Sequence, residues 1–427
     1  MLPPKQQDVL NRITREEVAH LTYELVRIPS ETGHEGEVSR FYANYLNSAG
    51  IPARLQYVQE GRPNVIGELK GIGGGPNLLL FGHIDTIPWG ACVPAKLDDD
   101  VVWGRGSSDM KSSLAAIAVA AKAIREAGIR LKGTTWLAAG VGHEVTWPIG
   151  AASFPYGDGP RALAAMIARG EIKPDYCVVT EGPIDSVKTV QGGQAVYRIT
   201  VGGGPGAVHT TTTTVDHSPA VWAGEVLLFL HRYCKEIEER PLHPLIPQSP
   251  RLEIGMVAGG DFFNRNPAQV QVVGCIRWNP DWSKEQVEAD FVERLQRLQG
   301  ELRRRYADDS IGLNLEFILV RDACDAGESP KTLELAERLI RIAQPFIGEM
   351  KGLSGTRAVD DIAVFYKEAG IPTVCYGPSF PGVMGLTPEG VQVGYAHSDN
   401  EGQPIDCIYK VAKVYASLMM DLCGVAE

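Results

Sequence analysis

The stretch Leu78–Lys111, LLLFGHIDTIPWGACVPAKLDDDVVWGRGSSDMK, decides the fold of this chain. Its first four residues are a continuous apolar run without polar alternation, which is typical of a strand buried on both faces of a sheet. His83 and Asp85 follow Gly82 at positions i and i+2, so their side chains point the same way if the strand continues. Open α/β sheets place their active sites at this carboxyl end of the strands. The stretch therefore predicts a functional site at the edge of a buried sheet.

A metal ion suits a His and an Asp in this position. Imidazole and carboxylate groups are common ligands of divalent transition metals. A ligating His usually has its other ring nitrogen fixed by a hydrogen-bond acceptor, so Asp85 is a candidate both for that acceptor and for a ligand. The spacing alone leaves both roles open.

Asp109, in the segment GRGSSDMK, is a further candidate ligand. Gly104 and Gly106 indicate a turn, and the Ala-rich run that ends near Arg125 predicts a helix. Asp109 thus lies near a helix start, where Asp is also a favoured N-cap. The neighbouring His-x-Asp pattern favours the metal interpretation over the cap.

Length and composition exclude several classes of protein. A chain of 427 residues exceeds the usual span of one core, so we expect two domains, one of them discontinuous. With 41 Lys and Arg against 52 Asp and Glu, the net charge of -11 would repel nucleic acid. No apolar run is long enough to span a membrane, and the N-terminus lacks the apolar core of a signal peptide. Eight Cys without a C-x-x-C pattern indicate reduced core residues, and we expect a soluble cytoplasmic protein.

Two further strand-like runs also end in possible ligands. Residues 134–139 are followed by His143 and Glu144, and residues 176–180 are followed by Glu181. Helical patterns between the strands predict βαβ connections and a mainly parallel sheet. His397 lies in GYAHSDNEG, after the aperiodic stretch Pro378–Gly394, and a loop of that length is often functional.

The sequence texture changes near residue 192. From there to residue 320 the order of elements is β-α-β-β-α-β, the pattern of a small ferredoxin-like domain. We therefore predict a catalytic domain in two parts, residues 1–191 and 321–427, with residues 192–320 inserted between them.

Seven motifs in order resemble those of the acetylornithine deacetylase, succinyl-diaminopimelate desuccinylase and aminoacylase family of metallopeptidases. They are GHIDTIP, GRGSSDMKSSLAA, HE before a Gly-rich turn, TEGP, the isolated His209, GIPTVCYGP and AHSDNEG. The resemblance covers nearly the whole chain. It implies an α/β fold, in which a mainly parallel-sheet metallohydrolase domain carries a ferredoxin-like α+β lid and dimerisation domain.

The same resemblance assigns roles to residues. It implies one or two divalent metal ions per subunit (Zn, Mn or Co) and a homodimer or higher homo-oligomer. Asp109 would bridge the metals, Asp85 would orient His83, and His209 would act in the partner subunit's active site. The implied ligands are His83, Asp109, Glu144, Glu181 and His397.

One position departs from the family pattern. Where the family has two adjacent Glu, the first as general base and the second as ligand, this chain has His143 followed by Glu144. A His can accept a proton near neutral pH or bind a metal. His143 is therefore a candidate for base, for ligand, or for neither.

Candidate substrate contacts lie in the insert and after it. Asn264 and Arg277 match lid positions at which the family grips a substrate carboxylate, and Arg357 is a third candidate. The Arg fork suits a carboxylate, although each Arg can equally form an ion pair with a nearby Asp. The aromatic residues proposed for a flat pocket, or alternatively for the core, are Trp89, Trp147 and Phe380.

These observations predict a metal-dependent hydrolase that cleaves a C–N bond of a small carboxylate-bearing molecule. The changed base supports two alternatives. One is a catalytically silent binding protein, and the other is a hydrolytic deaminase similar to nitroanthranilate aminohydrolase, an outlier of the family. A dipeptidase ranks lower because it needs the family's usual base.

Overall fold

The computed structural model describes residues 3–144, 158–379, 384–386 and 392–426. The chain forms two compact units, unit 1 (Met1–Thr189, Ala326–Ser354 and Asp360–Glu427) and unit 2 (Val190–Asp325 and Gly355–Val359). Unit 2 corresponds to the insert predicted at residues 192–320, and it also includes a short segment predicted to belong to the catalytic domain. Trp147, Phe380 and parts of the predicted loop 378–394 lie outside the described residues.

The sheet of unit 1 is mixed rather than mainly parallel throughout. Its strand order is β1-β2-β6-β3-β7-β17-β8, and the central strands β6, β3, β7 and β17 are parallel. The outer strands β1, β2 and β8 are antiparallel, partly because only Glu60 and Gly61 join β1 to β2 and so short a connection forms a hairpin. The strands are β1 (Ala53–Gln59), β2 (Arg62–Leu69), β3 (Leu78–His83), β6 (Thr135–Gly140), β7 (Tyr176–Val179), β8 (Val187–Gln191) and β17 (Thr373–Cys375).

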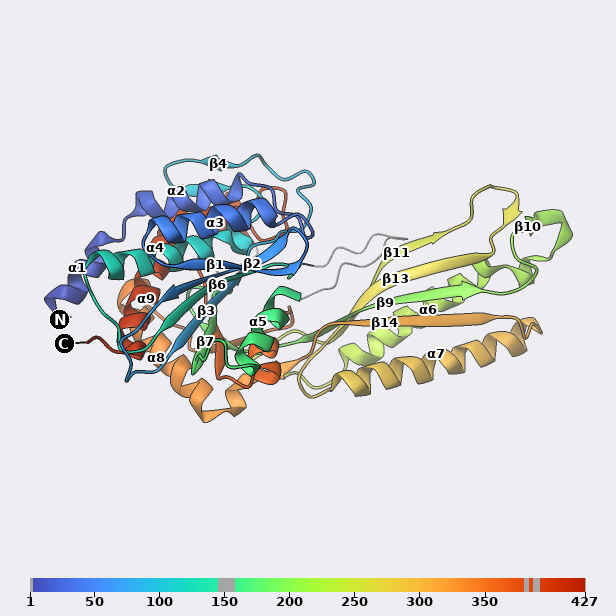
Figure 1. The fold of residues 1–427 in the computed structure, drawn as a ribbon. Coiled ribbons are helices and arrows are strands. Elements are labelled where there is room, and N and C mark those ends of the chain that lie inside the picture. Colours follow the sequence, from blue (N-terminus) through green and yellow to red (C-terminus); the bar gives the residue numbers. More distant parts are fainter. Residues whose placement is uncertain (1–2, 145–157, 380–383, 387–391, 427) are drawn as a thin grey trace. The chain divides into compact units, whose positions relative to one another are not determined.

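Helices cover the sheet of unit 1. Figure 1 shows α2, α3 and α4 together along one face, with α5 on the other side. Among them α1 lies where no helix was expected from the sequence. The helices are α1 (Pro4–Arg12), α2 (Arg15–Val26), α3 (Gly36–Ser48), α4 (Ser112–Glu126), α5 (Asp158–Ala168), α8 (Pro330–Ile347) and α9 (Ile405–Cys423).

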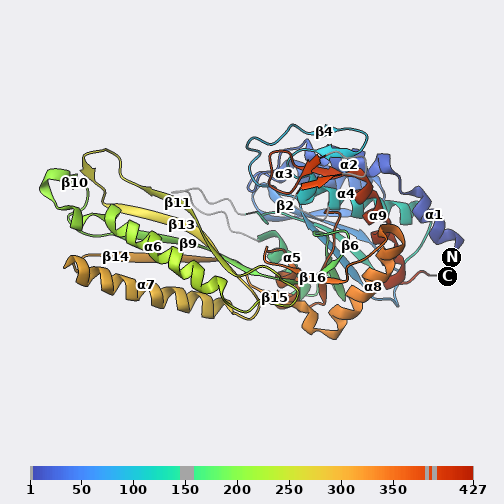
Figure 2. The same ribbon diagram turned by 180° about the vertical axis from the view of Figure 1, so that it is seen from behind.

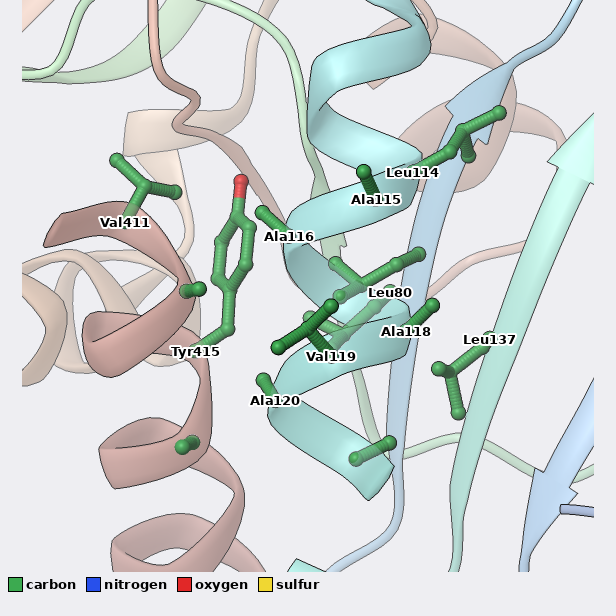
Figure 3. Packing of buried hydrophobic residues seen from close by; sticks show 14 of the residues in the cluster. Leu80, Leu114, Ala115, Ala116, Ala118, Val119, Ala120, Leu137, Val411 and Tyr415 are labelled. Atoms are coloured by element: carbon green, nitrogen blue, oxygen red, sulfur yellow. The ribbon is translucent and has the colours of Figure 1, made fainter. Parts of the chain in front are cut away.

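The Ala-rich helix α4 is the centre of the core. Figure 3 shows Ala116 and Ala120 facing Tyr415 of α9, while Leu80 and Leu137 of the sheet lie on the other side of the helix. Small side chains let α4 approach both layers closely, and all five of these residues are fully buried. The helix therefore holds the segment just ahead of it, which contains Asp109, against the sheet.

Short elements complete unit 1. A π-helical turn, Ser107–Lys111, precedes α4, and a second one covers Val364–Glu368. The short strands are β4 (Lys96–Leu97), β5 (Val101–Trp103), β18 (Met384–Leu386), β19 (Gln392–Gly394) and β20 (Gly402–Pro404).

Unit 2 has the predicted ferredoxin-like fold. Its four main strands are antiparallel in the order β11-β13-β9-β14, and Figure 2 shows α6 and α7 on the same face of that sheet. The elements are β9 (Gly193–Gly202), β10 (Val208–His209), α6 (Pro219–Glu238), β11 (Arg251–Gly259), β12 (Arg265–Asn266), β13 (Gln269–Trp278), α7 (Lys284–Tyr306), β14 (Gly312–Arg321) and β15 (Cys324–Asp325). One more strand, β16 (Leu353–Thr356), lies at the boundary with unit 1.

Two expectations from composition can be compared with the structure. All eight Cys are free thiols, and six of them are buried. Among the described residues, no helix combines the length and apolar character needed to cross a bilayer.

Candidate metal centre

Three adjacent parallel strands bring separate motifs to one edge of the sheet. β3 lies between β6 and β7, with His83 opposite Gly140 at the end of β6. His143 and Glu144 follow β6 at once, and Glu181 follows β7 by two residues. Because parallel strands end at the same edge, segments 60 to 100 residues apart in sequence converge there.

Asp109 is not the N-cap of α4, so the cap alternative is wrong. The cap position is Lys111, and its side chain makes no capping hydrogen bond. Asp109 has an extended backbone (φ -131°, ψ 94°) within the π-helical turn. Its Oδ1 lies 2.9 Å from Nε2 of His83, and its Oδ2 lies 3.4 Å from Nε2 of His397. One carboxylate oxygen therefore faces each His, as in a carboxylate that bridges two metal ions.

The two His residues share their protons with neighbouring carboxylates. Nε2 of His397 lies 2.8 Å from Oε1 of Glu144. Hydrogen bonds with Asp109 and Glu144 raise the pKa of His397 to about 10. Burial opposes protonation of His83, but the hydrogen bond and charge of Asp109 outweigh it and raise its pKa well above the ordinary value. Protons thus stand where bound cations would balance the carboxylates.

Glu181 has the features of a carboxylate that lacks its cation. Its Oε2 is buried and has no hydrogen-bond partner among the described residues, which is rare for a buried oxygen. Burial raises the pKa of Glu181 to about 7, against the opposing charge of Lys188. The Lys188 ammonium is itself ion-paired with Asp360 at 3.0 Å.

The spacing of these donor atoms fits divalent cations. Nitrogen and oxygen ligands 2.0–2.2 Å from one ion lie about 2.8–3.6 Å from each other at tetrahedral or octahedral angles. The three distances among His83, Asp109, Glu144 and His397 lie between 2.8 and 3.4 Å. Two groups of donors that could hold an ion emerge, His83 with Asp109 and Glu144, and His83 with His143 and Glu181.

Asp85 organises the site from beneath. Its main-chain oxygen lies 3.0 Å from Nδ1 of His83, whereas its carboxylate is 3.7 Å from that nitrogen. The carboxylate instead accepts hydrogen bonds from the main-chain N–H groups of His143 and Glu144 and from the Thr32 hydroxyl. Asp85 therefore orients His83 through its carbonyl and fixes the next segment through its side chain.

His143 is buried and contacts two groups of the site. Its ring stacks on that of His83, with centroids 4.2 Å apart and an interplanar angle of 5°. Its Nδ1 lies 2.9 Å from Oδ2 of Asp361. The sequence analysis did not single out Asp361, and the adjacent acids Asp360 and Asp361 in an aperiodic segment were the only signal.

Glu401 is a second residue that the sequence analysis missed. Its Oε1 accepts hydrogen bonds from the main-chain N–H groups of Gly106, Ser108 and Asp109, and its Oε2 is paired with Arg105 at 2.5 Å. Glu401 therefore joins the loop of Asp109 to the motif of His397. Its position in AHSDNEG, four residues after His397, was the available signal.

The remaining predicted residues belong to unit 2. Nε2 of His209 lies 3.3 Å from Nδ2 of Asn264, and Nδ1 of His209 contacts the Thr211 hydroxyl. Arg277 has a buried Nη1 without a hydrogen-bond partner among the described residues. Arg357 donates to the carbonyl of Ser249. The structure thus brings His209 and Asn264 together in unit 2, while the predicted metal ligands converge in unit 1.

Comparison with known proteins gives relatives of one kind. A LysW-lysine/LysW-ornithine hydrolase of Pyrococcus abyssi is 39% identical over 105 residues, 25% of this chain and 29% of that relative. The chain therefore aligns with less than a third of that relative's length. A succinyl-diaminopimelate desuccinylase of Beijerinckia indica is 24% identical over 319 residues, 71% of this chain and 75% of the relative.

Solved structures share the fold. The Bacillus subtilis YXEP protein, described as a dinuclear metal binding peptidase from the M20 family, has a TM-score of 0.59 at 15% identity and covers 95% of this chain and 98% of its own. The family model described as peptidase family M20/M25/M40 matches residues 79–421, which include all five predicted metal ligands. This protein therefore belongs to peptidase family M20/M25/M40.

Proposed function

We propose that this protein is a metal-dependent hydrolase that cleaves a C–N bond of a small, carboxylate-bearing molecule. The position of Asp109 carries the proposal, because its two carboxylate oxygens face His83 and His397 separately. Divalent cations bound there would activate a water molecule and polarise a substrate oxygen. Glu144 and Glu181 would complete the two ligand sets. Relatives named as a desuccinylase and a hydrolase of modified amino acids support a C–N bond as the target.

A cluster of Arg residues in unit 2 supports a carboxylate on the substrate. Arg251 and Arg277 are directly paired across β11 and β13. Burial and the charges of these two neighbours lower the pKa of Arg357. The buried Nη1 of Arg277 needs an acceptor, and a carboxylate supplies two. Arg277 and Arg357 are therefore the proposed carboxylate contacts, with Asn264 as a further polar contact.

The proposal includes cofactor, assembly and location. The donor set of His and carboxylates suits Zn, Mn or Co, one or two per subunit. His209 serves the active site of a neighbouring subunit in a homodimer or larger homo-oligomer. The protein acts in the cytoplasm on a small molecule, without nucleic acid or membrane as partner.

Metal reconstitution tests the proposal. The protein is treated with a chelator, dialysed, and reloaded separately with Zn, Mn or Co, and turnover is followed on N-acyl amino acids, dipeptides and amino-substituted aromatic acids. We expect activity to be lost with the metal and restored by at least one of the ions. Metal-independent turnover contradicts the mechanism, and calorimetry that shows metal-dependent binding without turnover of any compound favours a silent binding protein.

A hydrolytic deaminase is the second candidate, and it is favoured by His143 at the position of the family's base. A buried imidazole paired with Asp361 is bulkier than a Glu and offers a donor as readily as an acceptor. In this reaction a water oxygen bonds to an aromatic carbon, the C–N bond breaks, and the nitrogen leaves as ammonia. Ammonia release from aminobenzoates such as a nitroanthranilate is compared with N-acyl hydrolysis, in the natural chain and in His143→Glu. Efficient N-acyl hydrolysis without any ammonia would exclude the deaminase.

A further inference from the structure

The stacking of His143 on His83 restricts how the two rings can use a shared metal ion. A nitrogen lone pair lies in the plane of its ring, so an ion bound by His83 lies in that plane, about 2.0–2.1 Å from the nitrogen. The two planes are parallel within 5°. Stacked rings keep their planes about 3.5 Å apart by van der Waals contact. The ion would then lie about 3.5 Å outside the plane of His143, too far for a bond.

Proximity alone therefore misleads at this position. The donor atoms of His83, His143 and Glu181 lie within 4.8 Å of one another, which makes them a candidate group of ligands. Their ring planes exclude His83 and His143 as ligands of one ion in this arrangement. The same separation leaves space for a water or substrate atom between His143 and the ion.

Asp361 determines which nitrogen of His143 is available for such an atom. An ionised carboxylate only accepts hydrogen bonds, so the bond of 2.9 Å places a proton on Nδ1 of His143. In the neutral ring the lone pair is then on Nε2. Asp361 is 1% exposed and His143 is 6% exposed, so solvent competes little for this bond.

We infer that His143 is not a ligand of the ion that His83 would hold, and that Asp361 is a positioning residue that keeps Nε2 of His143 as a hydrogen-bond acceptor for the reacting atoms. In this chain a His–Asp pair thus takes the place of the single Glu base. The inference rests on the metal centre of the proposed function and deepens it by assigning a role to Asp361.

Nuclear magnetic resonance of protein with ¹⁵N-labelled His, loaded with ¹¹³Cd, tests the first half of the inference. We expect scalar coupling between cadmium and ring nitrogens of His83 and His397, and none for His143, whose signals are identified by their loss in His143→Gln. Coupling between cadmium and His143 would overturn the inference. If no His couples because the protein takes up no metal, the proposed function fails instead.

The tautomer tests the second half without any substrate. In zinc-loaded and in metal-free protein, His143 should show a proton on Nδ1 and a lone-pair nitrogen shift on Nε2. Asp361→Asn should change both signals, and Asp361→Glu should restore them in part. An unchanged tautomer in Asp361→Asn would refute the positioning role even if the metal centre is correct.

Kinetics separate positioning from general structural damage. On the substrate found in the screen, Asp361→Asn should lower kcat about ten- to a hundred-fold, the range for loss of a residue that orients an active-site group, while KM and metal content change little. The matched control is Asp360→Asn, because its carboxylate pairs with Lys188 rather than with His143. The control should lower thermal stability but leave the His143 tautomer intact. Equal effects of both variants on the tautomer would contradict the inference.

Discussion

The carboxylate of Glu401 accepts a hydrogen bond from the main-chain N–H of Asp109 at 3.3 Å, although the two residues are 292 positions apart in the sequence. The same oxygen accepts the N–H groups of Gly106 and Ser108. Gly106 has φ +90°, a conformation that favours Gly, so the loop needs both this residue and this acceptor. Glu401 thus holds the predicted bridging carboxylate in position.

Glu401→Gln should therefore weaken the metal centre without altering any predicted ligand. It leaves the buried Arg105 guanidinium without its charge partner, which costs about 3–5 kcal/mol of folding stability. Loss of support for a ligand typically lowers metal affinity about 10- to 100-fold. Calorimetric zinc titration and thermal denaturation measure the two effects. The exposed carboxylate in the same motif provides the control, because Asp399→Asn should alter neither; unchanged zinc affinity in Glu401→Gln would contradict the role.

Metal affinity should increase with pH. In the metal-free protein the pKa of His397 is about 10, and a bound cation must displace that proton. Each displaced proton raises the apparent affinity about tenfold per pH unit below this pKa. Competition titrations with a chromophoric chelator between pH 6 and pH 9 measure the slope. An affinity independent of pH would show that His397 is not displaced from its proton by the ion.

Arg277→Gln should raise KM more than it lowers kcat. A charge-assisted hydrogen bond to a carboxylate is worth about 1.5–3 kcal/mol, so the expected increase in KM is about 10- to 150-fold. Arg277→Lys should recover only part of the loss because it cannot form the planar fork. Steady-state kinetics with a substrate and its amide analogue provide the measurement. Equal losses on both compounds would place Arg277 outside carboxylate recognition.

Hybrid active sites test the proposed role of His209. If it acts in the neighbouring subunit, His209→Ala and His83→Ala homodimers should each be inactive, while a mixture of the two should regain activity through hybrid sites. Subunit exchange is confirmed with differently tagged chains. Exchange without any recovery would place His209 in the site of its own subunit or outside catalysis.

Close packing of α4 predicts that its small residues are intolerant of enlargement. Ala116 faces Tyr415 and is fully buried, so Ala116→Leu should cost about 1–3 kcal/mol through overpacking. Thermal denaturation measures the change. The exposed Glu126 at the end of the same helix supplies a control, because Glu126→Ala should change the stability by less than about 0.5 kcal/mol. Similar shifts in both variants would argue against tight packing at Ala116.

The sequence by itself determined the local elements and their order. The apolar run at Leu78 gives the buried strand β3, because a strand covered on both faces shows no polar alternation. The β-α-β-β-α-β order of the insert gives the ferredoxin-like fold of unit 2. Residues directly after parallel strands converge for the same reason, so His83, Glu144 and Glu181 were recognisable as candidates before their distances were known.

Only the tertiary structure decided how these residues are held and oriented. Glu401 reaches Asp109, and Asp361 reaches His143 across 218 positions, through hydrogen bonds for which no local pattern exists. The stacking of His143 on His83 likewise depends on the neighbouring ends of β3 and β6. Periodicity and spacing record which face of an element a residue occupies, whereas the direction of a ring plane or a lone pair depends on atoms contributed by distant segments. For that reason the candidate ligands were recognisable in the sequence, while the geometry that separates ligand from positioning residue was not.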